Sequence, residues 1–219
     1  MTTTTLPQAS GTCTPAQRVT RSLLGYGAVA GPFYVAVTMA QAFTREGFDL
    51  TRHQWSLLAN GTLGWIHITN LVLTGLMTIA FAAGLGRALP GTTWAPRLVA
   101  VFGASLVTAG AFKADPAMGF PAGTPDGPRA VSWHGMLHLA SGAVGFTCLA
   151  VACFLIARQL RHAPGWARFS RATGVLFLAG FTAVATGAGA VWANLAFTAG
   201  VLLVWAWLAA VSVKLYRTV

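Results

Sequence analysis

The longest uncharged stretch of the chain, Ala172–Val213, is the feature that most constrains its fold. Its 42 residues contain no Asp, Glu, Lys or Arg. A helix needs only about 20 residues to cross the hydrocarbon core of a membrane. The stretch is therefore too long for one crossing and predicts two helices joined by a tight hairpin. Gly187, Gly189 and Asn194 cluster near its middle and place the turn between Thr186 and Asn194.

Four more apolar stretches of about spanning length precede this one. Only 8% of the 219 residues are charged, whereas a soluble domain carries about 25%. The sequence therefore predicts an all-α, polytopic integral membrane protein with six transmembrane helices. We expect residues 1–21 to form a disordered cytoplasmic tail and residues 22–219 a membrane domain. Its helices are expected at about residues 23–43, 66–86, 95–112, 133–157, 172–189 and 193–213.

The Lys and Arg residues predict the orientation of the helices. Ten of the 14 fall on the side of the two termini: Arg18, Arg21, Arg87, Arg97, Arg158, Arg161, Arg168, Arg171, Lys214 and Arg217. The opposite side holds Arg45, Arg52, Lys113 and Arg129, together with all four acidic residues, Glu46, Asp49, Asp115 and Asp126. Because cytoplasmic loops are enriched in Lys and Arg, both termini are expected in the cytoplasm. The net charge of +10 then needs no nucleic-acid partner, and the expected partners are membrane lipid and a lipid-like small molecule.

Polar side chains gather in the half of the helices that is expected to face outside. Gln41, His67, Asn70, His134 and His138 each need a hydrogen-bond partner at depth. Small and polar residues are common at helix–helix contacts in any membrane bundle, and this reading suits the Thr and Ser residues of the same faces. Ionisable groups inside a membrane, however, indicate a functional site. We therefore expect an outward-facing polar pocket.

The two long loops on that side are expected to cover the pocket. Residues 43–65 mix charges with aromatic residues, including Trp55, and suit an amphipathic segment at the interface. Residues 113–129 contain four prolines and three glycines, so they predict a structured cap and not a helix. Ordered loops on one face of a protein usually carry its function.

Several short motifs together resemble a known family. They are G-P-F-Y at 31–34, G-F-D-L-T-R-H at 47–53, G-W-I at 64–66, D-P-A-M-G-F-P-A-G-T-P at 115–125 and S-W-H-G-M-L-H at 132–138. Over about residues 22–215 the chain resembles the domain-of-unknown-function nine-nine-eight family of bacterial membrane proteins, common in actinobacteria. The resemblance implies a six-helix fold in the bacterial cytoplasmic membrane and no settled activity. The chain departs from the pattern at Gln54, where proline is expected, and at His67, where glutamine is expected, which weakens a general role for His67.

The polar residues support an enzyme as the first hypothesis. Asp49 or Asp115 with His134 or His138 would form an acid–base pair in a half-dry pocket, acting on an apolar lipid- or isoprenoid-like substrate. The remaining residues expected to line this pocket are His67, Asn70, Gln41, Arg52, His53, Trp55, Trp133 and Asn194.

Three other functions stay open. His134 and His138 are four residues apart, a spacing that places two imidazoles on one metal ion, but a third ligand is needed. A haem would need histidines on two facing helices, such as His67 and His138. A divalent metal and a haem are thus open cofactors, and neither is favoured over hydrogen-bonded structural histidines. The same pocket would also serve a non-catalytic lipid-binding protein or a transporter.

Overall fold

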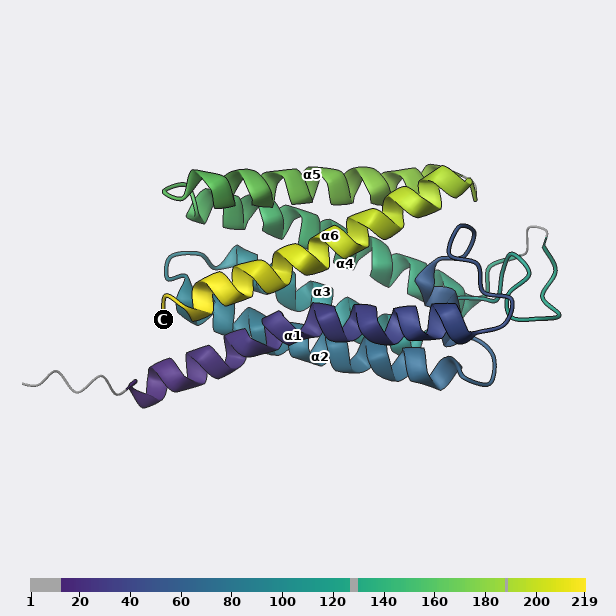
Figure 1. Cartoon of the computed structure of the whole chain (residues 1–219), viewed down its shortest axis with the longest axis horizontal. Helices are drawn as coiled ribbons and strands as arrows, with labels where there is room; N and C mark the ends of the chain where they lie inside the picture. Colours follow the sequence, from purple (N-terminus) through teal and green to yellow (C-terminus); the bar gives the residue numbers. More distant parts are fainter. Residues whose placement is uncertain (1–12, 127–129, 188) are drawn as a thin grey trace, which may run out of the picture.

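The computed structural model describes residues 13–126, 130–187 and 189–219. The chain forms six long helices and one short 3-10 helix, η1, shown in Figure 1: α1 (Pro15–Thr44), η1 (Trp55–Ala59), α2 (Gly64–Ala88), α3 (Trp94–Ala111), α4 (Trp133–Gln159), α5 (Pro164–Thr186) and α6 (Val191–Tyr216). Each of the six long helices is long and apolar enough to cross a membrane. The prediction of an all-α protein with six spanning helices is confirmed.

Two helices, α1 and α5, begin eight residues earlier than the sequence predicts. Residues 15–21, assigned above to a disordered tail, are the first turns of α1, and residues 1–12 lie outside the described residues. Thr14 accepts a hydrogen bond from the Gln17 backbone N–H (3.2 Å), and the Gln17 side chain accepts one from the Thr14 backbone (3.0 Å). This reciprocal pair satisfies the free amides at the start of the helix. In α5, Pro164 takes a first-turn position, where its missing N–H is not needed.

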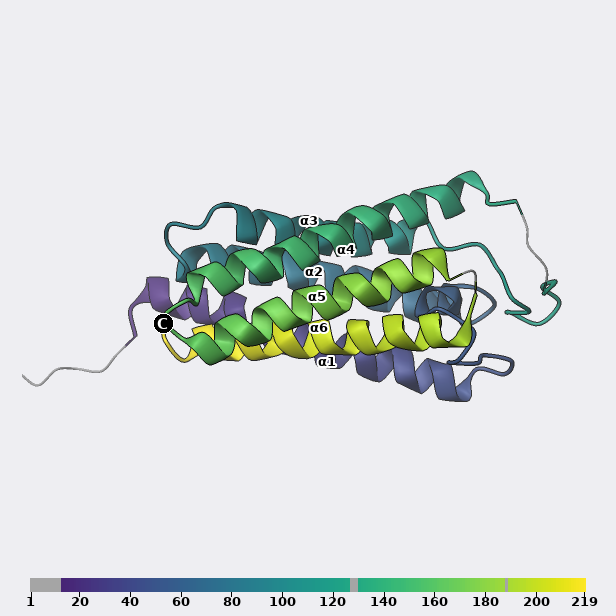
Figure 2. The same ribbon diagram turned by 90° about the horizontal axis from the view of Figure 1, so that it is seen from above.

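The six helices form a closed ring in chain order. Each helix packs against the next one, and α6 packs against α1 to complete the ring. In Figure 1, α5 lies at the top and α1 and α2 lie at the bottom; in Figure 2, α3 and α4 lie at the top and α6 and α1 lie at the bottom. Buried apolar side chains such as Phe81, Leu149 and Leu208 form the core of the ring.

Glycines allow a close backbone contact between α2 and α3. A Cβ atom added to Gly75 would lie 2.5 Å from the Gly103 carbonyl oxygen, and one added to Gly103 would lie 2.8 Å from the Gly75 carbonyl oxygen. The two backbones therefore touch at this point, which only residues without a side chain permit.

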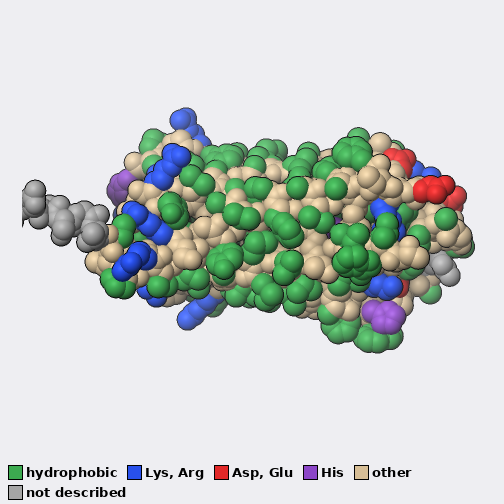
Figure 3. Space-filling model, turned by 60° about the horizontal axis from the view of Figure 1, so that its bottom comes forward, with side chains coloured by type: hydrophobic (Ala, Val, Ile, Leu, Met, Phe, Trp, Pro, Cys, Tyr) green, Lys and Arg blue, Asp and Glu red, His purple; other side chains and the backbone are tan. Residues whose placement is uncertain are grey.

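The two ends of the ring differ in charge. We call the end with residues 45–63, 112–126 and 130–132 the loop end, and the end with the C-terminus and the start of α1 the terminal end. Figure 3 shows Lys and Arg gathered at the terminal end and Asp and Glu at the loop end. The ten Lys and Arg residues assigned to one side by the sequence lie at the terminal end. Arg129 lies outside the described residues.

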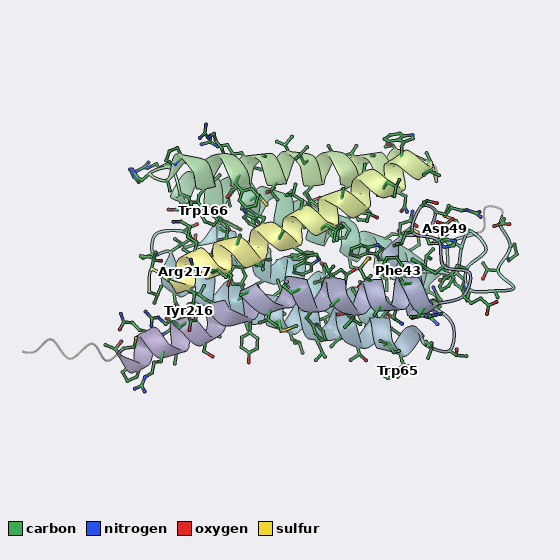
Figure 4. The ribbon with its side chains drawn as sticks, viewed as in Figure 1. Phe43, Asp49, Trp65, Trp166, Tyr216 and Arg217 are labelled. Carbon is green, nitrogen blue, oxygen red and sulfur yellow. The ribbon has the colours of Figure 1, made fainter. Side chains whose placement is uncertain are left out.

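Aromatic side chains mark both ends of the apolar surface. Trp65, Trp133 and Trp192 are exposed at the loop end, and Trp94 is exposed at the terminal end. Figure 4 shows Trp65 and Trp166 near opposite ends of the molecule. Such aromatic belts lie at the two membrane–water interfaces of membrane proteins. The exposed surface between the belts is apolar (Figure 3) and suits lipid.

The contact between α2 and α3 yields a prediction about stability. We expect Gly75→Ala to lower the apparent Tm in detergent by roughly 3–10 °C, because the new methyl group forces two packed backbones apart at a cost of about 1–3 kcal/mol. Gly25→Ala on α1 is the matched control, because nothing lies within 4 Å of its added Cβ. An unchanged Tm for Gly75→Ala would show that the two helices do not pack through these glycines.

Candidate functional site

A cavity of about 590 Å³ lies inside the ring near the loop end. All six long helices contribute to its lining, and η1 and the segment 114–117 cover it. Ligand pockets usually enclose about 300–1,000 Å³, so the volume suits one small amphiphilic molecule. Its lining divides into an aromatic part and a polar part.

Aromatic rings line the inner part of the cavity. Phe146 on α4 lies at their centre, with its ring centroid 5.5 Å from that of Phe177, 5.2 Å from that of Phe181 and 5.5 Å from that of Phe197. Further rings come from Tyr34, Phe102 and Trp205. These rings come from different helices and together form a mainly apolar chamber, in which Tyr34 and Trp205 each carry one polar group.

The polar part includes His138, whose ring is held by the end of α3. His138 Nδ1 lies 3.2 Å from the Ala109 carbonyl oxygen and 3.0 Å from the Phe112 carbonyl oxygen. Carbonyl oxygens only accept hydrogen bonds, so Nδ1 carries the proton and donates. The neutral ring then presents the lone pair of Nε2 as an acceptor. His138 lines the cavity, as the sequence predicts for a pocket residue.

Asp115 also lines the cavity and fastens the start of α4. Its Oδ2 accepts the Ser132 backbone N–H (2.7 Å), and its Oδ1 accepts the Ser132 hydroxyl (2.6 Å). Ser132 is the N-cap of α4 and accepts the Gly135 backbone N–H (3.1 Å). A Cβ atom at position 135 would collide with the Asp115 carboxylate. Glycine in S-W-H-G-M-L-H therefore lets the carboxylate reach the helix.

His134 and Trp133 lie on the outside of this helix start. Both are exposed, and their rings are 4.3 Å apart between centroids. His134 Nδ1 is 3.0 Å from the Ser132 hydroxyl oxygen. The Ser132 hydroxyl donates its hydrogen to Asp115, so its oxygen accepts a hydrogen bond from His134 Nδ1–H. The structure thus links His134 to Asp115 through Ser132, while His138 alone of the two histidines lines the cavity.

Asp49 and His53 organise the first long loop. The Asp49 backbone N–H donates to His53 Nδ1 (2.9 Å), and His53 Nε2–H donates to the Met118 carbonyl oxygen in the second loop (2.9 Å). The Asp49 side chain accepts two hydrogen bonds from Thr51, which lower the pKa of that carboxyl group. Figure 4 shows Asp49 at the loop end. Neither residue lines the cavity: His53 is buried between the loops and Asp49 is exposed.

Two arginines join the loops to one another and to η1. Arg52 forms an ion pair with Asp126 across the two loops (3.2 Å). Arg45 donates to the carbonyl oxygens of Leu58 (3.1 Å) and Asn60 (2.7 Å), and its guanidinium group lies 5.0 Å from the centre of the Phe120 ring. Partial burial lowers the pKa of Arg45. The sequence did not single out Arg45, although it fixes the cover of the cavity.

Four of the predicted pocket residues lie instead at contacts between elements. Asn70 donates to the Tyr34 carbonyl oxygen (3.1 Å) and to the Thr38 hydroxyl (3.2 Å), which joins α2 to α1. Gln41 donates to the Leu63 carbonyl oxygen (3.1 Å). Asn194 on α6 donates to the Leu50 carbonyl oxygen (2.9 Å) and holds the first loop. His67 is fully buried, and neither ring nitrogen has a hydrogen-bond partner among the described residues.

The described residues bring no three His, Cys, Asp or Glu side chains together as metal ligands. His67 and His138 lie on different helices, and His138 uses Nδ1 to bind the end of α3.

Trp55, predicted as a pocket residue, does line the cavity with its neighbours Gln54 and Ser56. The site thus consists of an aromatic chamber under a polar cover, with His138, Asp115 and the start of η1 at the boundary.

The bonds of Asp115 predict a local role in stability. We expect Asp115→Asn to destabilise the fold by about 1–3 kcal/mol, because an amide has one acceptor oxygen for the two Ser132 donors. Hydrogen exchange should quicken in the first turn of α4. Glu46→Gln is the control, because it removes one charge from an exposed residue of the same end. Equal Tm and equal exchange in both variants would contradict this role.

Comparison with known proteins identifies the family. No curated protein and no solved structure matched the chain. The family model described as protein of unknown function (DUF998) matches residues 28–214. This match covers all six spanning helices at least in large part, both loops and every residue that lines the cavity. The chain therefore belongs to the DUF998 family.

Proposed function

We propose that the protein binds an amphiphilic, lipid-like molecule in the cavity inside the ring. The division of the cavity into an aromatic chamber and a polar boundary carries this proposal. An apolar tail in the chamber would gain about 25 cal/mol for each Å² removed from water. A polar head would lie beside His138 and η1.

The molecule would enter sideways from the lipid between α4 and α5. Leu139 on α4 and Ala185 on α5 line the cavity, and both are exposed on the surface of the ring. The loop end is closed by Arg45 and by the bonds between the two loops. An apolar molecule would therefore enter from the lipid without breaking the bonds that close the loop end.

The charge distribution supports a location in the bacterial cytoplasmic membrane with the loop end outside. The terminal end carries ten Lys and Arg residues and no acidic residue among those described. The positive-inside rule then places it in the cytoplasm. The cavity would face the outer leaflet.

Acid–base catalysis is a second candidate, favoured by one observation. His138 lines the cavity with Nδ1 held as a hydrogen-bond donor, which leaves the Nε2 lone pair to act as a general base. Asp115 accepts two hydrogen bonds from Ser132 and would hold the start of α4 in place. If the protein is an enzyme, lipid recovered from His138→Leu should differ chemically from lipid recovered from the unchanged protein.

Filling the cavity tests the binding function directly. Gly142 lines the cavity, and the nearest atom to its added Cβ is 3.9 Å away, on Phe146. We expect the purified protein to retain a lipid-like molecule in native mass spectrometry and Gly142→Phe to lose at least nine-tenths of it. Val144→Phe is the matched control, because Val144 on the same helix is exposed and lies outside the cavity lining. Equal retention by the two variants would reject the proposal.

Labelling of cysteines tests the orientation. Cys13 lies at the terminal end beside Arg21. We expect a membrane-impermeant maleimide to label Cys13 only after the cells are permeabilised, and to label Glu46→Cys in intact cells in a Cys13→Ser background. The reverse pattern would place the loop end in the cytoplasm.

A further inference from the structure

Four arginines gather around the short connection between α4 and α5. Arg158 lies in the last turn of α4, Arg161 lies in the connection, and Arg168 and Arg171 lie near the start of α5. All four side chains are exposed. The connection belongs to the terminal end, where Figure 3 shows Lys and Arg gathered.

Three of these arginines have no partner among the described residues. No hydrogen bond, ion pair or ring contact within the described part of the chain reaches Arg158, Arg168 or Arg171. All four acidic residues of the chain lie at the loop end, so no acidic side chain is available to them. The counter-ions of these three guanidinium groups therefore come from outside the protein.

An apolar groove lies on the outer surface of the same two helices. It is lined by Phe154 on α4 and by residues of α5 that include Val175, Leu178 and Ala179. These three α5 side chains are exposed on the face of the ring that lipid would cover. No residue that lines the groove also lines the cavity. The groove is thus a separate feature outside the ring.

On α5, the arginines and the groove share one helix face. Arg171 precedes Val175 by four residues and Leu178 by seven, and Arg168 precedes Val175 by seven. Residues at these spacings lie above one another on one side of a helix. The groove therefore leads along α5 toward the two arginines.

On α4, Arg158 completes the same arrangement. It follows Phe154 by four residues and so lies on the same side of α4. A Cβ atom added to Gly174 would lie 3.1 Å from the Phe154 ring, which sets Phe154 level with Gly174 on α5. Arg158, one turn nearer the connection, is therefore level with the stretch of α5 that contains Arg168 and Arg171.

We propose that one anionic phospholipid from the leaflet at the terminal end binds in this groove. Its phosphate group lies between Arg158, Arg168 and Arg171, and an acyl chain lies along Phe154 and α5. Guanidinium groups bind phosphate oxygens through paired N–H donors, and basic sites between transmembrane helices bind anionic head groups. The site lies outside the ring, so this proposal goes beyond binding in the cavity and does not depend on it.

Native mass spectrometry of the full chain in detergent tests the site with two lipids. Dioleoylphosphatidylglycerol and dioleoylphosphatidylcholine have the same acyl chains, but only the first carries a net negative charge. We expect the unchanged protein to retain one molecule of the phosphatidylglycerol at a concentration at least fivefold below that needed for the phosphatidylcholine. Equal retention of the two lipids would overturn the proposal.

A triple variant connects this preference to the three arginines. The groove variant combines Arg158→Gln, Arg168→Gln and Arg171→Gln. We expect it to bind the phosphatidylglycerol at least tenfold more weakly than the unchanged protein, because it removes the donors to the phosphate group. Size-exclusion chromatography checks that it is folded, and the comparison of the two lipids on the unchanged protein stands without it.

The matched control removes the same charge from other parts of the same end. It combines Arg18→Gln, Arg97→Gln and Arg217→Gln, three exposed residues outside the groove. We expect this control to weaken phosphatidylglycerol binding less than threefold. Equal losses in the two triple variants would show that the terminal end attracts anionic lipid only through its overall charge, and the proposed site would be wrong.

Three single variants test the position of the acyl chain. Ala179→Phe places a ring in the groove and should weaken phosphatidylglycerol binding at least fivefold, whereas Leu176→Phe should not, because Leu176 is exposed on α5 outside the groove lining. Gly142→Phe fills the cavity and should leave this binding unchanged. Equal binding by Ala179→Phe and Leu176→Phe, or a loss in Gly142→Phe, would overturn the groove site. Neither result would bear on retention of a molecule in the cavity by the unchanged protein.

Discussion

The contact between α6 and α1 is the constraint on which the interior of the protein depends. It joins the last helix to the first and closes the ring. A Cβ atom on Gly31 would lie 3.1 Å from both the Cβ and the backbone oxygen of Trp205, and the Ser212 hydroxyl donates to the Leu24 carbonyl oxygen. Trp205, held by this contact, also lines the cavity. In lipid the hydrophobic effect does not drive helices together. Close packing through small residues and hydrogen bonds between helices holds them together instead.

The number and type of the helices could be predicted from the sequence, because few backbone structures can cross the hydrocarbon core of a membrane. Backbone groups in hydrocarbon must be paired within a helix, so the length of each uncharged stretch fixes the number of crossings. The helix ends could not be predicted in the same way. Arg18 and Arg168 lie inside α1 and α5, because long side chains extend to the interface while their backbone remains helical. A charge therefore marks the membrane boundary and not the end of the helix.

The candidate site could be predicted only in part. His138, Asp115 and Trp55 were singled out as polar or amphipathic residues near the outer ends of the helices, and the structure places them at the cavity. Asn70 is also a polar residue near the outer end of a helix, but its side chain joins α2 to α1 and does not line the cavity. The phenylalanines of the aromatic chamber could not be named from the sequence, because a residue such as Phe146 has the same sequence pattern whether it faces lipid or the interior of the ring. The spacing of Phe177 and Phe181, four residues apart on α5, is the signal that could have placed two of these rings on one helix face.

The most direct test of lipid binding is an experimental structure of the protein purified from its own membrane without added lipid. We expect elongated density inside the ring, with its apolar part against Phe146 and its head within hydrogen-bond distance of His138 Nε2. A cavity filled only by ordered water, or by side chains that have closed over it, would contradict a lipid-binding function.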